Sequence, residues 1–146
     1  MNWIYLAIAA LAGAAMALQG TFNAALGKTT GLWPSTVLVH VIGTVAALSI
    51  MLAFRIGWPA LGQLAQVPWY AFLGGVLNVL IIFAVVFTIP RVGVGNATTA
   101  IVVAQILTAV LVDALGLFGM KKYEFQYLDL LGIALLAVGS RILLLK

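Results

Sequence analysis

The chain has 146 residues, of which 65% are hydrophobic and 7% are charged, with a formal net charge of +4. A water-soluble domain of this length cannot bury so much apolar surface, so the composition excludes a soluble protein and indicates an integral membrane protein. The charges are scattered, cysteine is absent and histidine occurs once, which excludes a nucleic-acid-binding face, a disulfide framework and a metal site.

Five continuous apolar segments are long enough to cross a bilayer, which takes about 20 residues of helix. In chain order they cover residues 3–26, 35–54, 69–89, 94–118 and 128–145. Their apolar residues follow one another without alternation, so we expect helices and not the strands of a barrel. The sequence therefore predicts an all-α membrane protein whose single domain, residues 1–146, contains five transmembrane helices.

The segments between these helices carry turn and interface signals. Residues 27–34 (GKTTGLWP) place Pro34 at the start of the second helix, a position that suits proline. The longer connection at residues 55–68 stays partly apolar, which predicts that it lies in the membrane interface. Residues 90–93 (PRVG) predict a tight reversal, and Asp129 is expected in the first turn of the last helix.

Positive charges divide almost evenly between the two faces of the membrane. We call the face that holds the N-terminus side A and the opposite face side B. The basic residues near side A are Arg55, Lys121 and Lys122, and those near side B are Lys28, Arg91 and Lys146, with Arg141 added if its side chain snorkels outward. Orientation normally follows an excess of lysine and arginine on one side. The balance permits insertion in both orientations, with two opposed copies forming an antiparallel homodimer.

Polar side chains recur at similar depth in four of the five helices. Gln19 and Asn23 lie one turn apart on the first helix and therefore share a face. The others are His40 in the second helix, Asn78 in the third and Gln105 in the fourth. Such groups either join helices by hydrogen bonds or line a cavity that binds a small polar solute.

Asp113 is the only carboxylate set several residues inside an apolar segment, about 7 Å from the side A end of the fourth helix. An acid at such a position is a candidate for carrying a proton during a transport cycle. The alternative is a salt bridge with Lys121 or Lys122 near the interface.

Three motifs resemble those of a known transporter family. The segments QGTFNAALG (19–27), PWYAFLGGVLNV (68–79) and AQILTAVLVDALGLFG (104–119) are similar to patterns of the YdcZ-type branch of the drug/metabolite transporter superfamily. The resemblance covers essentially the whole chain. It implies a half-size transporter of five helices, from a family that occurs as single proteins, as pairs and as fused ten-helix forms with opposed halves.

The resemblance implies no particular substrate. The related small multidrug resistance proteins carry a membrane-buried glutamate in the first helix, and the matching place in this chain is near Gly13. We therefore do not expect the cation-exchange chemistry of that branch. The absence of an acid at the membrane midplane also disfavours a cationic drug bound by a carboxylate.

These observations together predict a bacterial inner-membrane transporter that moves a small polar metabolite by alternating access as a dual-topology homodimer. The expected partners are the lipid bilayer, a second antiparallel copy and the solute, without cofactor or nucleic acid. An enzyme is not expected, because no nucleophile–base pair or metal set is visible. The alternative of another class is a non-transporting membrane assembly or scaffold subunit, whose polar residues only join helices.

Overall fold

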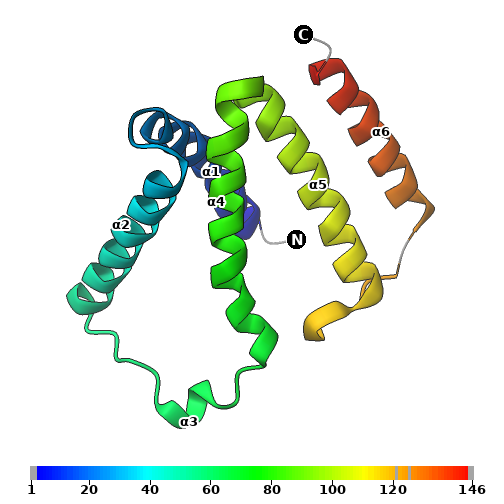
Figure 1. The fold of residues 1–146 in the computed structure, drawn as a ribbon. Coiled ribbons are helices and arrows are strands. Elements are labelled where there is room, and N and C mark those ends of the chain that lie inside the picture. The colour runs from blue at the N-terminus through cyan, green and yellow to red at the C-terminus, as the bar shows by residue number, and fades with distance from the viewer. Residues whose placement is uncertain (1–2, 121, 125, 145–146) are drawn as a thin grey trace. The chain divides into compact units, whose positions relative to one another are not determined.

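The computed structural model describes residues 3–120, 122–124 and 126–144 of the chain. Within these ranges the protein consists of helices and connecting segments, without a strand (Figure 1). Five helices are long and apolar enough to cross a membrane: Trp3–Thr30, Leu32–Ala53, Trp69–Val92, Val94–Leu115 and Tyr127–Leu144. The prediction of an all-helical protein with five membrane spans is confirmed.

The spans are built from the elements α1 (Trp3–Thr30), α2 (Leu32–Ala53), η1 (Trp69–Phe72) with α4 (Leu73–Val92), α5 (Val94–Leu115) and α6 (Tyr127–Leu144). A four-residue helix, α3 (Leu61–Leu64), lies in the long connection between α2 and α4. A short 3-10 turn, η2 (Leu117–Gly119), follows α5. It begins after Gly116, whose left-handed backbone (φ 61°, ψ 36°) ends the helix.

Several helix ends differ from those expected from the sequence: α2 begins at Leu32 instead of residue 35, and α5 ends at Leu115 instead of residue 118. The first helix continues to Thr30, where Lys28 in the last turn suits the negative end of the helix dipole. The helix α4 continues through Pro90 to Val92, so the reversal expected over residues 90–93 is confined to Gly93. Proline near the end of a helix removes one backbone donor but leaves the last residues helical. Residue 145, the expected end of the fifth span, lies outside the described ranges.

Single glycines separate α1 from α2 and α4 from α5. Gly31 has φ 90° and ψ 165°, and Gly93 has φ 83° and ψ 159°, a backbone region that only glycine adopts readily. The carbonyl of each glycine accepts the first hydrogen bond of the following helix, from Ser35 N and Ala97 N, both at 3.1 Å. One residue is therefore enough to end one span and begin the next.

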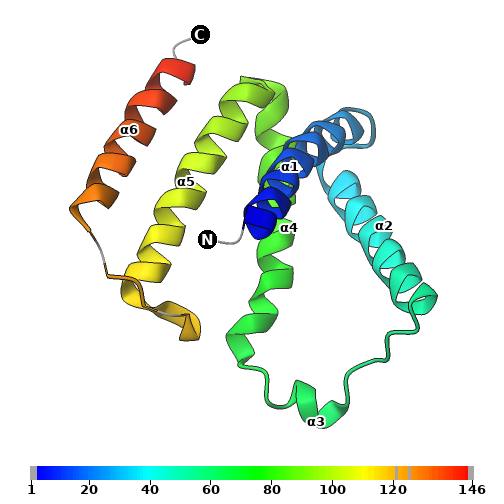
Figure 2. The ribbon, with the colours of Figure 1, turned by 180° about the vertical axis from the view of Figure 1, so that it is seen from behind.

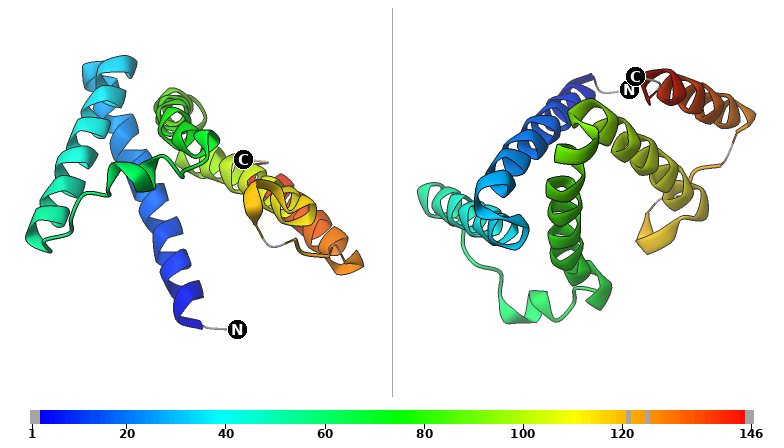
Figure 3. Two further views of the ribbon diagram at one scale, coloured as in Figure 1. Left: turned by 90° about the horizontal axis from the view of Figure 1, so that it is seen from below. Right: turned by 45° about the horizontal axis from the view of Figure 1, so that its top comes forward.

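The chain divides into two compact units, Met1–Arg91 and Val92–Lys146. In the first unit, α1 and α2 meet at Gly31 and diverge away from it, as the left view of Figure 3 shows. In the second unit, α5 and α6 run antiparallel beside each other (Figure 2). The assignment of one membrane domain to the whole chain stays a prediction.

The core of the first unit lies at the end where α1 and α2 meet. Its buried residues come from three helices and are Gly20, Asn23 and Ala24 of α1, Ser35 and Thr36 of α2, and Ile82, Val86 and Ile89 of α4. Most large apolar side chains elsewhere are exposed. Exposure of this kind suits contact with lipid chains, which are as apolar as the side chains themselves.

The start of α6 carries the acidic residue that the sequence places there. Asp129 lies in the first turn, and its Oδ2 accepts a hydrogen bond from the backbone N–H of Gln126 at 2.8 Å. A carboxylate at this position satisfies a backbone donor that the helix itself leaves open and favours the positive end of the dipole. The expectation for Asp129 is confirmed.

Candidate functional site

Two glycines on α1 create a close contact with α4. A Cβ atom added to Gly20 would lie 3.2 Å from side-chain atoms of both Val85 and Ile89. A Cβ added to Gly27 would overlap the side chain of Val86. Small residues allow helix backbones to approach in this way inside membranes. We call this contact, formed by Gly20 and Gly27 of α1 with Val85, Val86 and Ile89 of α4, the α1–α4 seam.

Asn23 lies on the same face of α1 as the two glycines of the seam, since it is three residues after Gly20 and four before Gly27. Its side chain is 7% exposed. Gln19, one turn earlier on α1, is exposed. The two carboxamides that share a face in the sequence therefore have different surroundings within this unit.

The side-chain amide of Asn23 makes no hydrogen bond within the part of the chain that the structure describes. In the same part, every side-chain nitrogen or oxygen that is completely buried has a partner. The side-chain nitrogen and oxygen of Asn23 are therefore not completely buried. A carboxamide offers two donors and an acceptor oxygen, and here all of this capacity is available to a molecule that reaches it.

His40 and Asn78 join α2 to α4. The Asn78 Nδ2 lies 3.1 Å from the His40 Nε2, and the His40 Nδ1 lies 2.7 Å from the carbonyl oxygen of Thr36. Because a carbonyl only accepts, Nδ1 carries the proton, and Nε2 of the neutral ring then accepts from the amide of Asn78. Both ring nitrogens are occupied, so His40 has no free hydrogen-bonding group for a solute.

The remaining predicted site residues are distributed over both units. The structure brings His40 and Asn78 together and places Gln19 and Asn23 on one helix of the first unit. Gln105 lies on α5 of the second unit, where its side chain is exposed. The shared solute site of these five residues stays a prediction.

Asp113 lies in the last turn of α5 and is exposed. Its backbone carbonyl accepts hydrogen bonds from Gly116 N at 3.3 Å and from Tyr123 N at 2.9 Å, which folds the following segment back onto the helix end. Among the described side chains its carboxylate has no ion pair with Lys122, and Lys121 lies outside the described residues.

Hydroxyl groups in the core contribute little binding capacity. Ser35 and Thr36 are buried, and both donate to the carbonyl oxygen of Leu32, at 2.8 and 2.9 Å. Sequence reasoning did not single them out, and their bonds stay within their own helix. The described residues contain no group of three His, Cys, Asp or Glu side chains that could hold a metal ion.

A family model described as "Putative inner membrane exporter, YdcZ" matches residues 4–142. No curated protein and no solved structure matches the chain. The match covers nearly the whole chain, so the chain belongs to the YdcZ family of drug/metabolite transporters and is an inner-membrane protein. The resemblance inferred from the sequence motifs is confirmed.

Proposed function

We propose that this member of the YdcZ family is a half-size transporter that moves a small, uncharged polar solute by alternating access as an antiparallel homodimer. The observation that carries the proposal is Asn23, a buried carboxamide whose donors and acceptor are free. A free polar group inside an apolar helix is costly, and a solute that hydrogen-bonds to it removes that cost.

The chemistry of the first unit favours an uncharged solute. Its three charged residues, Lys28, Arg55 and Arg91, lie in the last turns of α1 and α4 or just beyond the end of α2. Asn23 can offer both N–H groups and an oxygen, which fits a solute with donors and acceptors of its own. Gln19 and Gln105, which are exposed in the single chain, are proposed to complete the site when two copies pair.

The scaffold alternative has its own support in the pair of His40 and Asn78. Their hydrogen bond joins two helices and leaves His40 without free capacity, which is how polar groups behave when they only hold a membrane protein together. The two functions are distinguished by whether loss of the Asn23 side chain destabilises the protein as much as loss of the Asn78 side chain does.

The test compares Asn23→Leu with Asn78→Leu in purified protein, using thermal unfolding in detergent and a panel of amino acids, polyols, sugars and nucleosides. Asn23→Leu is expected to keep or raise the melting temperature, because it replaces an amide without a partner by an apolar group of similar size. It is also expected to abolish the stabilisation that a panel compound gives the wild type. Asn78→Leu should lose about 0.6–2 kcal/mol of stability, because His40 loses its donor.

The outcome that favours a scaffold is the reverse pattern. In that case Asn23→Leu lowers stability as much as Asn78→Leu, and no compound of the panel stabilises the wild type. A compound that binds is then followed into proteoliposomes, with and without a pH gradient. If Asp113 couples transport to protons, Asp113→Asn loses uphill transport and retains downhill exchange.

A further inference from the structure

A row of aromatic side chains leads to an arginine at the end of α4. The rings of Trp33 and Phe83 lie 4.7 Å apart, and those of Phe83 and Phe87 stack with 6.4 Å between centroids and 5° between planes. The guanidinium carbon of Arg91 lies 3.7 Å from the centroid of Phe87. The spacing of four residues from 83 to 87 to 91 is the signal in the sequence that predicts such a row on one helix face.

The guanidinium of Arg91 is held in a defined place. It stacks on the ring of Phe87, and its Nη1 donates a hydrogen bond to the backbone carbonyl of the same residue. Stacking and a backbone bond together restrict a side chain that would otherwise be mobile. A guanidinium has five N–H donors, so most of them stay available to an acceptor at the exposed end of α4.

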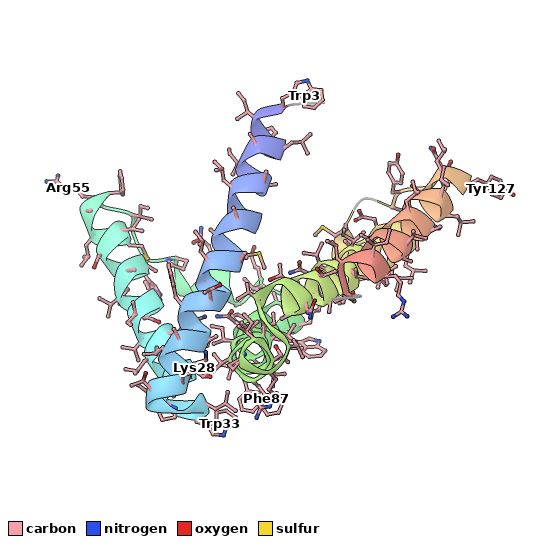
Figure 4. The ribbon with its side chains drawn as sticks, turned by 90° about the horizontal axis from the view of Figure 1, so that it is seen from above. Trp3, Lys28, Trp33, Arg55, Phe87 and Tyr127 are labelled. Carbon is pink, nitrogen blue, oxygen red and sulfur yellow. The ribbon has the colours of Figure 1, made fainter. Side chains whose placement is uncertain are left out.

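The surroundings of Arg91 are those of a membrane interface. Trp33 is 61% exposed and Phe87 is 43% exposed. Lys28 follows Gly27, which contacts α4 at Val86, so a second cation belongs to the same end of the unit. Figure 4 shows Trp33, Phe87 and Lys28 at this end, with Trp3 and Arg55 at the far ends of α1 and α2.

No acidic side chain of the first unit is available to neutralise these cations. The chain has three acidic residues, and all of them follow residue 112: Asp113, Glu124 and Asp129. Asp113, the first of them, lies 19 residues beyond the start of α5, which is about 28 Å along the helix. The anion that balances Arg91 and Lys28 must therefore come from outside the first unit.

We infer that Arg91 and Lys28 form a binding site for the phosphate of an anionic membrane lipid whose acyl chain lies along the aromatic row that ends at Trp33. The guanidinium binds phosphate oxygens in pairs, and Lys28 adds a point charge. The ring of Trp33, which contacts Phe83 about two turns before Arg91, offers an apolar surface to the rest of the lipid. The occupant is a lipid of the bilayer because the aromatic row continues from Arg91 through Phe87 and Phe83 to Trp33, along a face of α4 where an acyl chain would lie. The proposal is independent of the solute site.

The test uses delipidated protein in detergent, titrated with phosphatidylglycerol and, in parallel, with phosphatidylcholine of the same chain length, and read by native mass spectrometry and thermal shift. The wild type should bind phosphatidylglycerol more tightly than phosphatidylcholine. Arg91→Gln should weaken binding of phosphatidylglycerol about tenfold, the effect of losing one charged hydrogen-bonding group. Arg91→Lys, which keeps the charge but not the paired donors, should bind phosphatidylglycerol with an affinity between those of the wild type and Arg91→Gln.

The matched control is Arg55→Gln, which removes the same charge at the other end of α2 and should leave binding unchanged. Phe87→Leu, which removes the stacking partner and keeps all charges, should also weaken phosphatidylglycerol binding. Equal losses in Arg55→Gln and Arg91→Gln would overturn the site, as would equal binding of both lipids. Inorganic phosphate at millimolar concentration should neither stabilise the protein nor compete, and competition by it would overturn the assignment to a lipid.

Discussion

Asn23 and Asn78 are the same residue type in two apolar helices, and their neighbours give them different properties. Asn78 is exposed within its unit and donates to His40, whereas Asn23 is buried and has no hydrogen-bond partner in the described residues. Asn23 lies between Gly20 and Gly27 on α1, where that helix meets Val85, Val86 and Ile89 of α4 and Ser35 of α2. The geometry at single residues therefore selects which carboxamide remains free to bind a solute.

The seam makes a prediction about Gly27. In Gly27→Ala the new methyl group overlaps Val86, and overpacking of this kind costs about 1–3 kcal/mol, more than the gain in helix propensity of up to about 1 kcal/mol. We expect a lower melting temperature in detergent. Gly13→Ala is the control, because nothing lies within 4 Å of its added Cβ, and it should melt at or above the wild-type temperature.

A double variant shows whether the loss of stability in Gly27→Ala comes from packing against Val86 or from another cause. Val86→Ala removes the methyl groups that meet the new side chain, so Gly27→Ala combined with Val86→Ala should be more stable than the sum of the two single effects predicts. Strict additivity of the two changes would show that the contact between Gly27 and Val86 does not form.

Among the elements, the single-glycine turns determine how the spans begin and end. Gly31 and Gly93 have nearly the same backbone angles, and each is followed at once by a membrane-spanning helix. Both turns lie on side B of the membrane in the predicted topology. In both, only one residue separates the two helices, which leaves little of the backbone without hydrogen bonds.

Replacing either glycine by alanine tests these turns. The backbone angles of Gly31 and Gly93 are strained for any residue with a Cβ, at a cost of about 1–3 kcal/mol. We expect Gly31→Ala and Gly93→Ala to lower the melting temperature while helix content by circular dichroism stays the same. Gly75→Ala inside α4, where nothing lies within 4 Å, should be neutral or stabilising. If all three variants melt alike, the backbone at the two turns differs from that described.

At the scale of the whole molecule, charge and exposure both point to partners outside the single chain. In the predicted topology basic side chains are nearly balanced between the two faces, and in the structure large apolar side chains are exposed along every span. Lipid chains or a second copy can cover such a surface. The family match supports a transporter in the inner membrane, and the antiparallel pair remains our proposal.

Dual topology predicts mixed accessibility of one position. The chain has no cysteine, so Thr29→Cys introduces a unique label on side B without changing the charge. In intact cells an impermeant thiol reagent should label part of the population. Adding positive charge to side A by Ala65→Lys with Gln66→Lys should direct side A to the cytoplasm and raise the labelled fraction toward completion.

The control for this experiment is Ala65→Ser with Gln66→Ser, which changes the same exposed connection without adding charge and should leave the labelled fraction as it is. Complete labelling, or none, in the Thr29→Cys protein without added lysines would rule out the antiparallel homodimer. Orientation would then be single, and the solute site would have to be formed by parallel copies or by one chain.

The sequence by itself determined the five membrane spans, because a bilayer admits only segments whose backbone bonds are all internal and whose side chains are apolar for about 20 residues. It also determined the helix cap at Asp129, because the capping bond joins residues only three positions apart, and it contains the family motifs. It missed the helical end of α4, since Pro90 predicts a break, whereas the helix persists to Val92.

Only the tertiary structure decided which polar side chains have a hydrogen-bond partner and which have none. The partner of His40 lies 38 residues along the chain at Asn78, and Val86, which meets Gly27, lies 59 residues beyond it. Periodicity within one helix assigns a face to a residue but not the helix that this face meets. Burial and hydrogen bonding depend on which helices meet, so Gln19 and Asn23 look equivalent in the sequence and become distinct only in the packed structure, where Asn23 is buried and Gln19 is exposed.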